Sequence, residues 1–163
     1  MRISSRGQYG LRALAVLAQR HGGRPTQVRE IARVEGLSAK YLEQLLGRLK
    51  GGGLVKSVRG ARGGYQLARP AREITVREVL VLLEGSLAPT ECVEGEGSTC
   101  RVTPACTAHA VWSGLYDTVL TFLDSFTLAD LLARIGPEEG ALEAHADPAA
   151  AAEPVLEPAG ARG

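Results

Sequence analysis

Three cysteines and a histidine lie close together in the second half of the chain, and their side chains are suited to binding an inorganic centre. They are Cys92, Cys100, Cys106 and His109, with the spacing C-x7-C-x5-C-x2-H. This set contains all three cysteines and one of the three histidines of the 163-residue chain. Three thiolates and an imidazole form a soft ligand set that suits zinc or an iron–sulfur cluster.

Other roles of cysteine fit this stretch poorly. A buried thiol often acts as a small apolar side chain, but the loop between Cys92 and Cys100 is rich in glycine and glutamate and shows no apolar periodicity. A disulfide is disfavoured because the number of cysteines is odd and no export signal precedes them. We therefore favour metal or cluster ligation, with inert or redox-active thiols as the alternative.

The charge of the chain is unevenly distributed. Residues 1–80 carry 16 lysines and arginines against 5 acidic residues, a net charge of +11, whereas residues 81–163 carry 3 against 13, a net charge of −10. A basic first half predicts a polyanionic partner, and nucleic acid is the obvious candidate. The sequence shows no apolar run long enough for a membrane span, so we expect a reduced, cytoplasmic protein without a membrane partner.

The first half has the pattern of a helix-turn-helix unit. A helix is predicted over residues 9–20, with one buried face formed by Leu11, Leu14, Ala15 and Ala18. Thr26 is predicted to cap a second helix ending at Gly36, and Ser38 a third running to about residue 50. The third helix has an apolar stripe of Leu42, Leu45, Leu46 and Leu49. Its remaining side chains, which include Lys40, Tyr41, Glu43, Gln44 and Arg48, point elsewhere.

A hairpin is predicted directly after these helices. Residues 54–58 and 65–67 read as short strands, and the turn between them contains Arg59 and Arg62. Narrow minor grooves concentrate negative potential and attract inserted arginines. We therefore favour a DNA-binding wing over an ordinary exposed hairpin loop.

The rest of the chain is predicted to contain three more helices. Thr75 and Glu78 form a capping box for one, whose residues 79–83 are apolar enough to be buried on most sides. A long helix over about residues 104–124, with Pro104 at its first position, places Cys106 and His109 on one face. Its apolar residues cover more than one stripe, which predicts a homodimer.

A last short helix is capped by Thr127 with Asp130 and stops at Gly136 and Pro137, and residues 138–163 read as a disordered tail. The expected division is a DNA-binding domain over residues 1–84, a cluster-binding loop over 85–103, a dimerisation helix and short closing helix over 104–136, and a tail over 137–163.

The order of these parts resembles one known family. RISSRGQYGLRAL at the start, LSAKYLEQLLGRLK, GLVKSVRGARGGYQLARP, the Cys-x5-Cys-x2-His-Ala-Val-Trp segment and FTLADLL are similar to the IscR/NsrR/CymR family of dimeric bacterial winged-helix repressors. The resemblance covers residues 1–135. It implies a mainly α fold, namely a winged helix-turn-helix with a long C-terminal dimerisation helix.

Within the family the chain most resembles the IscR branch, which binds a [2Fe–2S] cluster through three cysteines and a histidine. This implies that Cys92, Cys100, Cys106 and His109 are the ligands. Two departures stand out: the Cys92–Cys100 spacing is wider than usual, and Gln8 occupies the position at which the nitric-oxide-sensing branch has an acidic ligand.

The resemblance also assigns the DNA contacts. It implies that Ser38, Lys40, Tyr41 and Gln44 meet base edges and phosphates in the major groove and that Arg59 enters the minor groove. Glu43 either controls which DNA sites are accepted, because a carboxylate accepts from cytosine N4 and repels phosphate, or pairs with a nearby cation on the helix surface.

The expected function is therefore transcriptional regulation, most simply repression, through binding to a double-stranded DNA operator. The signal would be iron–sulfur cluster, redox or nitric oxide status. A [4Fe–4S] cluster, a structural zinc or a thiol-based redox switch in the same fold are alternatives, and a CCCH zinc module that binds RNA is a remote one. An enzyme is disfavoured because the sequence contains no phosphate loop, no GxSxG and no paired carboxylates in an apolar setting.

Overall fold

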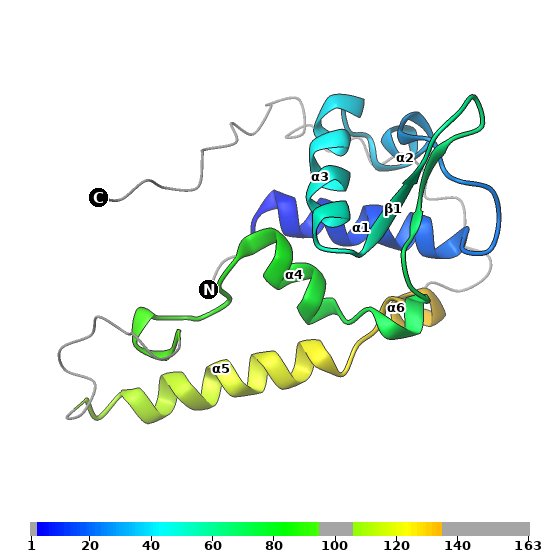
Figure 1. Cartoon of the computed structure of the whole chain (residues 1–163). Coiled ribbons are helices and arrows are strands. Elements are labelled where there is room, and N and C mark those ends of the chain that lie inside the picture. Colours follow the sequence, from blue (N-terminus) through cyan, green and yellow to red (C-terminus); the bar gives the residue numbers. More distant parts are fainter. Residues whose placement is uncertain (1–2, 95–105, 135–163) are drawn as a thin grey trace.

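The computed structural model describes residues 3–94 and 106–134 (Figure 1). Its elements in chain order are α1 (Ser5–Gln19), α2 (Val28–Glu35), α3 (Ala39–Gly51), β1 (Val55–Val58), β2 (Gly64–Leu67), the short 3-10 helix η1 (Ala71–Glu73), α4 (Val76–Glu84), the short 3-10 helix η2 (Glu91–Val93), α5 (His109–Asp124) and α6 (Leu128–Arg134). This confirms a mainly helical fold with one small sheet. Cys100, the predicted helix stop at Gly136 and the predicted tail lie outside the described residues.

The predicted helix-turn-helix is formed by α2 and α3. Helix α2 ends at Gly36, whose φ of 66° is a left-handed conformation that glycine adopts without strain. Helix α3 begins as predicted, because the Ser38 hydroxyl accepts the backbone N–H of Tyr41 at 3.2 Å. Only Leu37 and Ser38 separate the left-handed glycine from the first residue of α3, so the turn is short.

The two strands form the predicted hairpin. They are antiparallel, with Val55 opposite Leu67 at the end of the hairpin that lies away from its turn. Thr26 extends this sheet, since its N–H donates to the carbonyl of Tyr65 at 2.9 Å and its carbonyl accepts from the Tyr65 N–H at 2.8 Å. The prediction that Thr26 caps α2 is therefore wrong, and Gln27 occupies the cap position.

Helix α1 has a broader buried face than predicted, because it contacts α2, α3, α4, α6 and β2. Leu11 and Ala15 are only half-buried, contrary to the predicted stripe. The buried residues of α1 are Gly7, Gly10, Ala13, Leu14, Val16, Leu17 and Ala18. The four leucines of the α3 stripe are all buried in the same core, as predicted.

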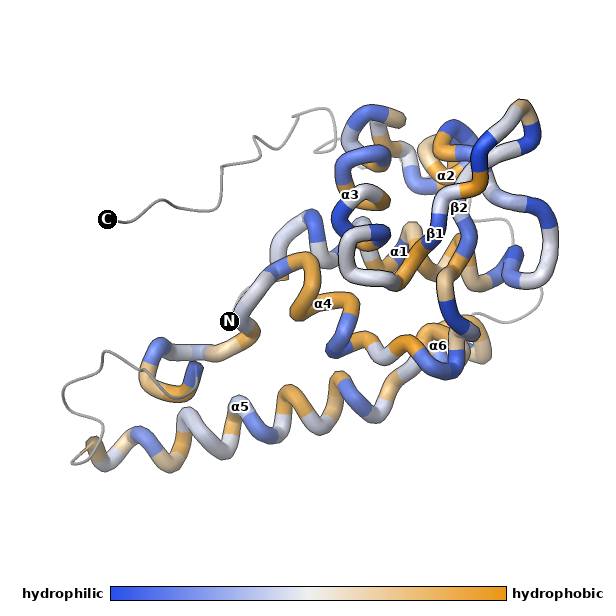
Figure 2. Tube along the Cα trace, in the orientation of Figure 1, coloured by the Kyte–Doolittle hydropathy of each residue, from blue (hydrophilic) through white to orange (hydrophobic). Residues whose placement is uncertain are grey.

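Helix α4 is largely apolar and lies between α1 and α5 (Figure 2). Its predicted cap is half present: the Thr75 hydroxyl accepts the Glu78 N–H at 3.2 Å, while the Glu78 carboxylate pairs with Arg69. The expectation that residues 79–83 are buried on most sides is wrong for Val81, which is 42% exposed.

The contact between α1 and α4 is made almost at backbone level. A Cβ atom at Gly10 would lie 2.1 Å from Cδ1 of Leu83, and one at Gly7 would lie 2.3 Å from Oε1 of Glu84. Neither distance is compatible with a side chain at that position unless the Leu83 or Glu84 side chain, or α4 itself, moves. The two glycines of α1 therefore set the separation of these helices.

The long helix starts later than predicted. Helix α5 begins at His109, and Cys106 precedes it in a turn closed by a 3.1 Å hydrogen bond from the His109 N–H to the Cys106 carbonyl. Cys106 and His109 therefore do not share a face of one helix, although the predicted end at Asp124 is correct. No helix in residues 3–94 and 106–134 is long and apolar enough to cross a membrane.

Helix α6 returns to the core of the first half. Leu128 is fully buried, and its N–H donates to the carbonyl of Ile74 at 3.0 Å. The predicted cap is present, because the Asp130 carboxylate accepts the Thr127 N–H at 2.8 Å. The closing helix thus packs with the elements of residues 1–84 rather than separately from them.

The close approach of α1 and α4 predicts that Gly10→Ala is destabilising. The added methyl group must displace Leu83 in a packed core, which typically costs about 1–3 kcal/mol. Gly47→Ala is the matched control in α3, because nothing lies within 4 Å of its Cβ position; it should stabilise by about 0.5–1 kcal/mol. Urea unfolding measures both, and equal stability of the two variants would contradict the packing argument.

Candidate functional site

The polar side chains on α3 form an exposed face opposite its buried leucines. The predicted contact residues Lys40, Glu43, Gln44 and Arg48 are exposed on it, and so is the N-cap residue Ser38. An α-helix fits the major groove of B-DNA, where each base pair presents its own pattern of donors and acceptors. Cations, an amide and a hydroxyl on this face supply the donors that phosphates and base edges accept.

The wing turn exposes the two predicted arginines, Arg59 and Arg62. The turn is tight: Gly60 has a φ of 110°, and a Cβ atom at Gly63 would lie 2.3 Å from the carbonyl oxygen of Val58. Glycines are therefore required at these positions. Because they have no side chains, the guanidinium groups of Arg59 and Arg62 are the main polar groups that the turn presents.

Further exposed cations lie on the same unit and were not assigned from the sequence. Arg29 and Arg33 are exposed on α2, and Lys56 is exposed on β1. The two arginines are four residues apart, so they lie on one helix face. This spacing could have predicted from the sequence that both arginines lie on one basic face. With them, the basic surface extends beyond α3 and the wing.

Tyr41 is placed differently from the other predicted DNA contacts. Its ring packs edge-on against the ring of Tyr9, with 6.2 Å between centroids. Its hydroxyl is buried and has no hydrogen-bond partner in the part of the chain that the structure describes. Burial raises the pKa of Tyr41. The hydroxyl is therefore covered by protein, and the edge-on packing against Tyr9 favours a role for Tyr41 in positioning α3.

A buried ion pair joins α1 to α2 next to these rings. Arg12 Nε lies 2.6 Å from Glu35 Oε2, and the Glu35 side chain is 1% exposed. Burial raises the pKa of Glu35, and the charge of Arg12 opposes that shift. The Arg12 guanidinium also lies 5.8 Å from the centroid of the Tyr9 ring, within cation–π range.

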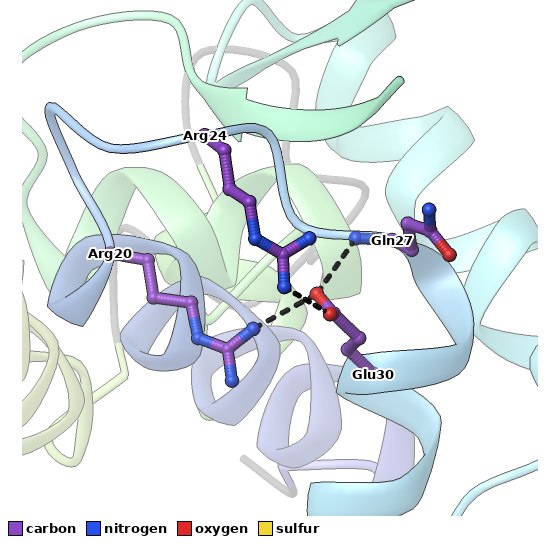
Figure 3. Close-up of polar contacts among 4 residues, drawn as sticks. All are labelled: Arg20, Arg24, Gln27 and Glu30. Atoms are coloured by element: carbon purple, nitrogen blue, oxygen red, sulfur yellow. Dashed lines mark hydrogen bonds and ion pairs between the residues drawn. The ribbon is translucent and has the colours of Figure 1, made fainter. Parts of the chain in front are cut away.

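A second polar cluster joins the end of α1 to the start of α2 (Figure 3). The Glu30 carboxylate accepts from Arg24 at 2.5 Å, from Arg20 at 3.0 Å and from the backbone N–H of Gln27 at 3.3 Å. The hydrogen bond from Arg24 is the main cause of a lowered pKa of Glu30. Both ion clusters therefore hold α2 against α1 and set the orientation of the helix-turn-helix.

Three of the four predicted ligands lie in described residues. Cys92 is half-buried in η2, with its sulfur 3.2 Å from the hydroxyl of Thr90. Cys106 is half-buried just before α5, and His109 is the first residue of that helix. Ser113 Oγ lies 3.4 Å from Nε2 of His109.

The chemistry of these donors fits an inorganic centre only in part. Nδ1 of His109 is buried and has no hydrogen-bond partner among the described residues, and both described thiols are free. Element η2, which contains Cys92, contacts α5. Within the described ranges, however, no three His, Cys, Asp or Glu side chains are grouped closely enough to hold a metal ion.

A comparison with protein families shows to which family the chain belongs. The model of the Rrf2 family, described as an iron-dependent transcriptional regulator, matches residues 3–134. The chain is a member of the Rrf2 family. Its Rrf2 relatives are transcriptional regulators and not enzymes, as expected from the sequence.

Two named Rrf2 relatives illustrate the similarity. The HTH-type transcriptional regulator CymR of Bacillus subtilis is 40% identical over 141 residues, covering 86% of this chain and 96% of the relative. The HTH-type transcriptional regulator IscR of Photorhabdus laumondii is 39% identical over 132 residues, covering 81% of this chain and 79% of the relative. The predicted resemblance to the IscR/NsrR/CymR family is confirmed.

Solved structures agree on the fold. CymR of B. subtilis, described as its global cysteine regulator, matches with a TM-score of 0.70 at 39% identity, covering 82% of this chain and 98% of that one. IscR of T. potens matches with a TM-score of 0.66 at 41% identity, covering 83% and 89%. The chain is thus a DNA-binding transcriptional regulator with the winged-helix fold of these Rrf2 structures.

The buried Glu35 predicts a specific pH dependence of stability. Its pKa in the folded state is raised above the ordinary value of 4.5, so the folded state binds more protons than the unfolded state from pH 4.5 up to the raised pKa. Stability is lost as the pH rises through this interval. The stability of Glu35→Gln relative to wild type should therefore increase as the pH rises above 4.5, as measured by urea unfolding.

Glu30→Gln is the control with the opposite sign. The pKa of Glu30 is lowered, so its contribution is present above pH 4.5 and is lost at lower pH. Relative to wild type, this variant should lose stability as the pH rises from about 3 through 4.5. Parallel curves for both variants and wild type would contradict the two assignments.

The exposed wing predicts that Arg62 contacts phosphates. Arg62→Gln should lower the slope of log affinity against log salt by about 0.9, the amount expected for one lost phosphate contact. Fluorescence anisotropy with a random-sequence 30-base-pair duplex measures this slope. Arg72→Gln is a matched control, because Arg72 is also exposed but lies in η1, which follows the end of the hairpin away from its turn. Equal slopes for the Arg62→Gln and wild-type proteins would exclude the contact.

Proposed function

We propose that this Rrf2 protein is a dimeric cytoplasmic regulator whose binding to a double-stranded DNA operator is controlled by a [2Fe–2S] cluster. Cys92, Cys100, Cys106 and His109 would hold the cluster. Support comes from the similarity to IscR and from a family description that names iron dependence. When bound, the cluster supplies a redox-active iron centre that is lost on oxidation, exposure to nitric oxide or iron scarcity.

The observation that carries this proposal is the state of His109. Its Nδ1 atom is buried without a hydrogen-bond partner in the described structure, and such a group costs about 1–3 kcal/mol when left unsatisfied. Ligation would remove that cost. Because η2 already contacts α5, ligation through Cys92 and His109 would join the segment after α4 to the start of α5.

The proposed dimer rests on the surface of α5. None of its residues is buried in the described structure. Val111 is 63% exposed, Leu115 is 44% exposed and Phe122 is 61% exposed. A contiguous set of exposed apolar side chains on one helix of a small protein marks an interface. We assign that interface to the same helix of a second copy, which places two recognition helices on one operator.

DNA binding itself is assigned to the exposed face of α3 and to the wing. Ser38, Lys40, Gln44 and Arg48 would meet the major groove, Arg59 would enter the minor groove, and Arg62 would contact the phosphates beside it. Glu43 is exposed on the same face, where a carboxylate selects for cytosine and against phosphate. Suppose that the protein has two conformations that differ in operator affinity. Cluster binding can then change that affinity only as far as the cluster binds one conformation more tightly than the other, typically by about 1–3 kcal/mol or 5–150-fold.

A thiol-based switch in the same fold is the second candidate. Both described cysteines are free and half-buried, and they belong to no metal-binding group among the described residues. The solved CymR relative is described as a global cysteine regulator. In this case Cys92 and Cys106 would respond to oxidation without any metal.

Anaerobic purification tests the proposal directly. We expect a brown protein with equal iron and sulfide per chain and no zinc, as determined by absorption spectroscopy and elemental analysis. Cys106→Ala should be colourless and still dimeric, with operator affinity shifted by roughly 5–150-fold relative to the loaded wild type. Operators would be selected by the wild-type protein from random DNA.

Ser113→Ala is a suitable control, because it removes a hydroxyl near His109 but no predicted ligand. A colourless wild type with one zinc per chain would support a structural ion instead. A metal-free wild type whose DNA binding changes with thiol oxidation would support the thiol switch. A metal-free protein that binds DNA equally with and without the cysteines would refute both.

A further inference from the structure

One carboxylate connects the end of α4 with the start of α1. Oε1 of Glu84 accepts the backbone N–H of Ser4 at 3.0 Å, the hydroxyl of Ser4 at 2.8 Å and the backbone N–H of Gly7 at 2.9 Å. Ser4 is the N-cap residue of α1, and Gly7 lies in its first turn. Glu84 therefore caps a helix that lies more than 70 positions earlier in the sequence.

Helix α1 depends on this distant group for its negative charge. Its own first turn contains no acidic residue, although a helix N-terminus is stabilised by an anion because several backbone N–H groups point outward there. The cap also requires Gly7, since a Cβ atom at that position would lie 2.3 Å from the Glu84 oxygen. The sequence of α1 is thus compatible with receiving its cap from α4.

Glu84 is also the residue of α4 that is nearest in the chain to the predicted ligands. It is the last residue of α4, and Gly85 follows it with a φ of 83°. Leu87 is then buried with Val76 and Leu80 of the same helix, ahead of η2 and Cys92. A displacement of the ligand segment therefore acts first on the end of α4.

On its other side, α1 contacts the recognition helix α3. Tyr9 lies half a turn after Gly7 and packs edge-on against Tyr41 of α3, at 6.2 Å between ring centroids. The start of α1 is therefore in contact with both the capping carboxylate and the aromatic pair that positions α3.

We propose that Glu84 is a positioning residue that couples the ligand segment to the recognition helix by capping α1. When the cap is made, α1 holds Tyr9 against Tyr41 and keeps α3 in one orientation. When a change in the ligand segment moves the end of α4, the cap is released and the start of α1 loosens. The inference rests on the proposed function, because it concerns how ligation reaches the DNA.

The test compares wild type with Glu84→Gln and Glu84→Ala, and with Glu73→Gln as a control that removes the same charge from an exposed site. The first readout is the ratio of operator affinities between cluster-loaded and apo protein, with an operator selected by wild type. We expect the Glu84 variants to reduce this ratio at least about threefold, out of the roughly 5–150-fold typical of such coupling, while Glu73→Gln leaves it unchanged.

The second readout is amide hydrogen exchange of apo protein in peptides covering residues 3–10 and 38–44. Faster exchange in both peptides of the Glu84 variants, with circular dichroism showing an intact fold, would support the link. A fold-intact Glu84→Ala with a wild-type affinity ratio, or with unchanged exchange in residues 38–44, would overturn it. If wild type itself shows no response to the cluster, the proposed function fails, and the exchange of residues 38–44 alone decides whether Glu84 positions α3.

Discussion

The close approach of α4 to α1 is the constraint on which the rest of the structure depends. Because glycines occupy the two contact positions of α1, Leu83 packs directly onto the helix backbone and Glu84 reaches its first turn. A contact of this kind leaves no flexible side chain on the α1 side to absorb a displacement. Movement of α4 therefore acts directly on the backbone of α1, which contacts α2, α3 and α6 as well.

The charged side chains of this protein have two roles: some are available to bind DNA, and others hold the helices of the DNA-binding unit in position. The exposed cations of α2, α3 and the wing remain available to a polyanion, whereas Arg12, Arg20 and Arg24 are bound to acidic partners inside the unit. The Arg12–Glu35 pair adds little net stability, because burying the Glu35 carboxylate carries a desolvation cost that offsets its attraction to the half-exposed Arg12. Its 2.6 Å contact does join α2 to α1, and the recognition helix follows α2 after a short turn.

Features that depend on neighbouring residues could be predicted from the sequence, and those that depend on distant contacts could not. The caps at Ser38, Thr75 and Thr127 are local hydrogen bonds between a side chain and a backbone N–H three positions later, so their residue pattern is sufficient. Thr26 has the same chemistry but is held by Tyr65, 39 positions away, as the register of the sheet requires. The inward position of Tyr41 and the cap that Glu84 provides to α1 likewise depend on tertiary packing. The order of residues along the chain therefore does not predict either of them.

The way α5 is held determines what a ligand bound at its first residues would do. Its far end is fixed to the core, since the N–H of Val76 donates to the carbonyl of Phe126 at 2.8 Å and Leu128 is fully buried just beyond. Its first turns carry exposed Val111 and Trp112, whereas Tyr116, Leu120 and Leu123 further along pack against the cluster of Val76, Leu80 and Leu87. A helix fixed at one end and weakly held at the other changes direction when its free end gains a bond. Ligation at His109 would therefore reorient α5 with respect to α4, and a partner copy bound along α5 would be reoriented with it.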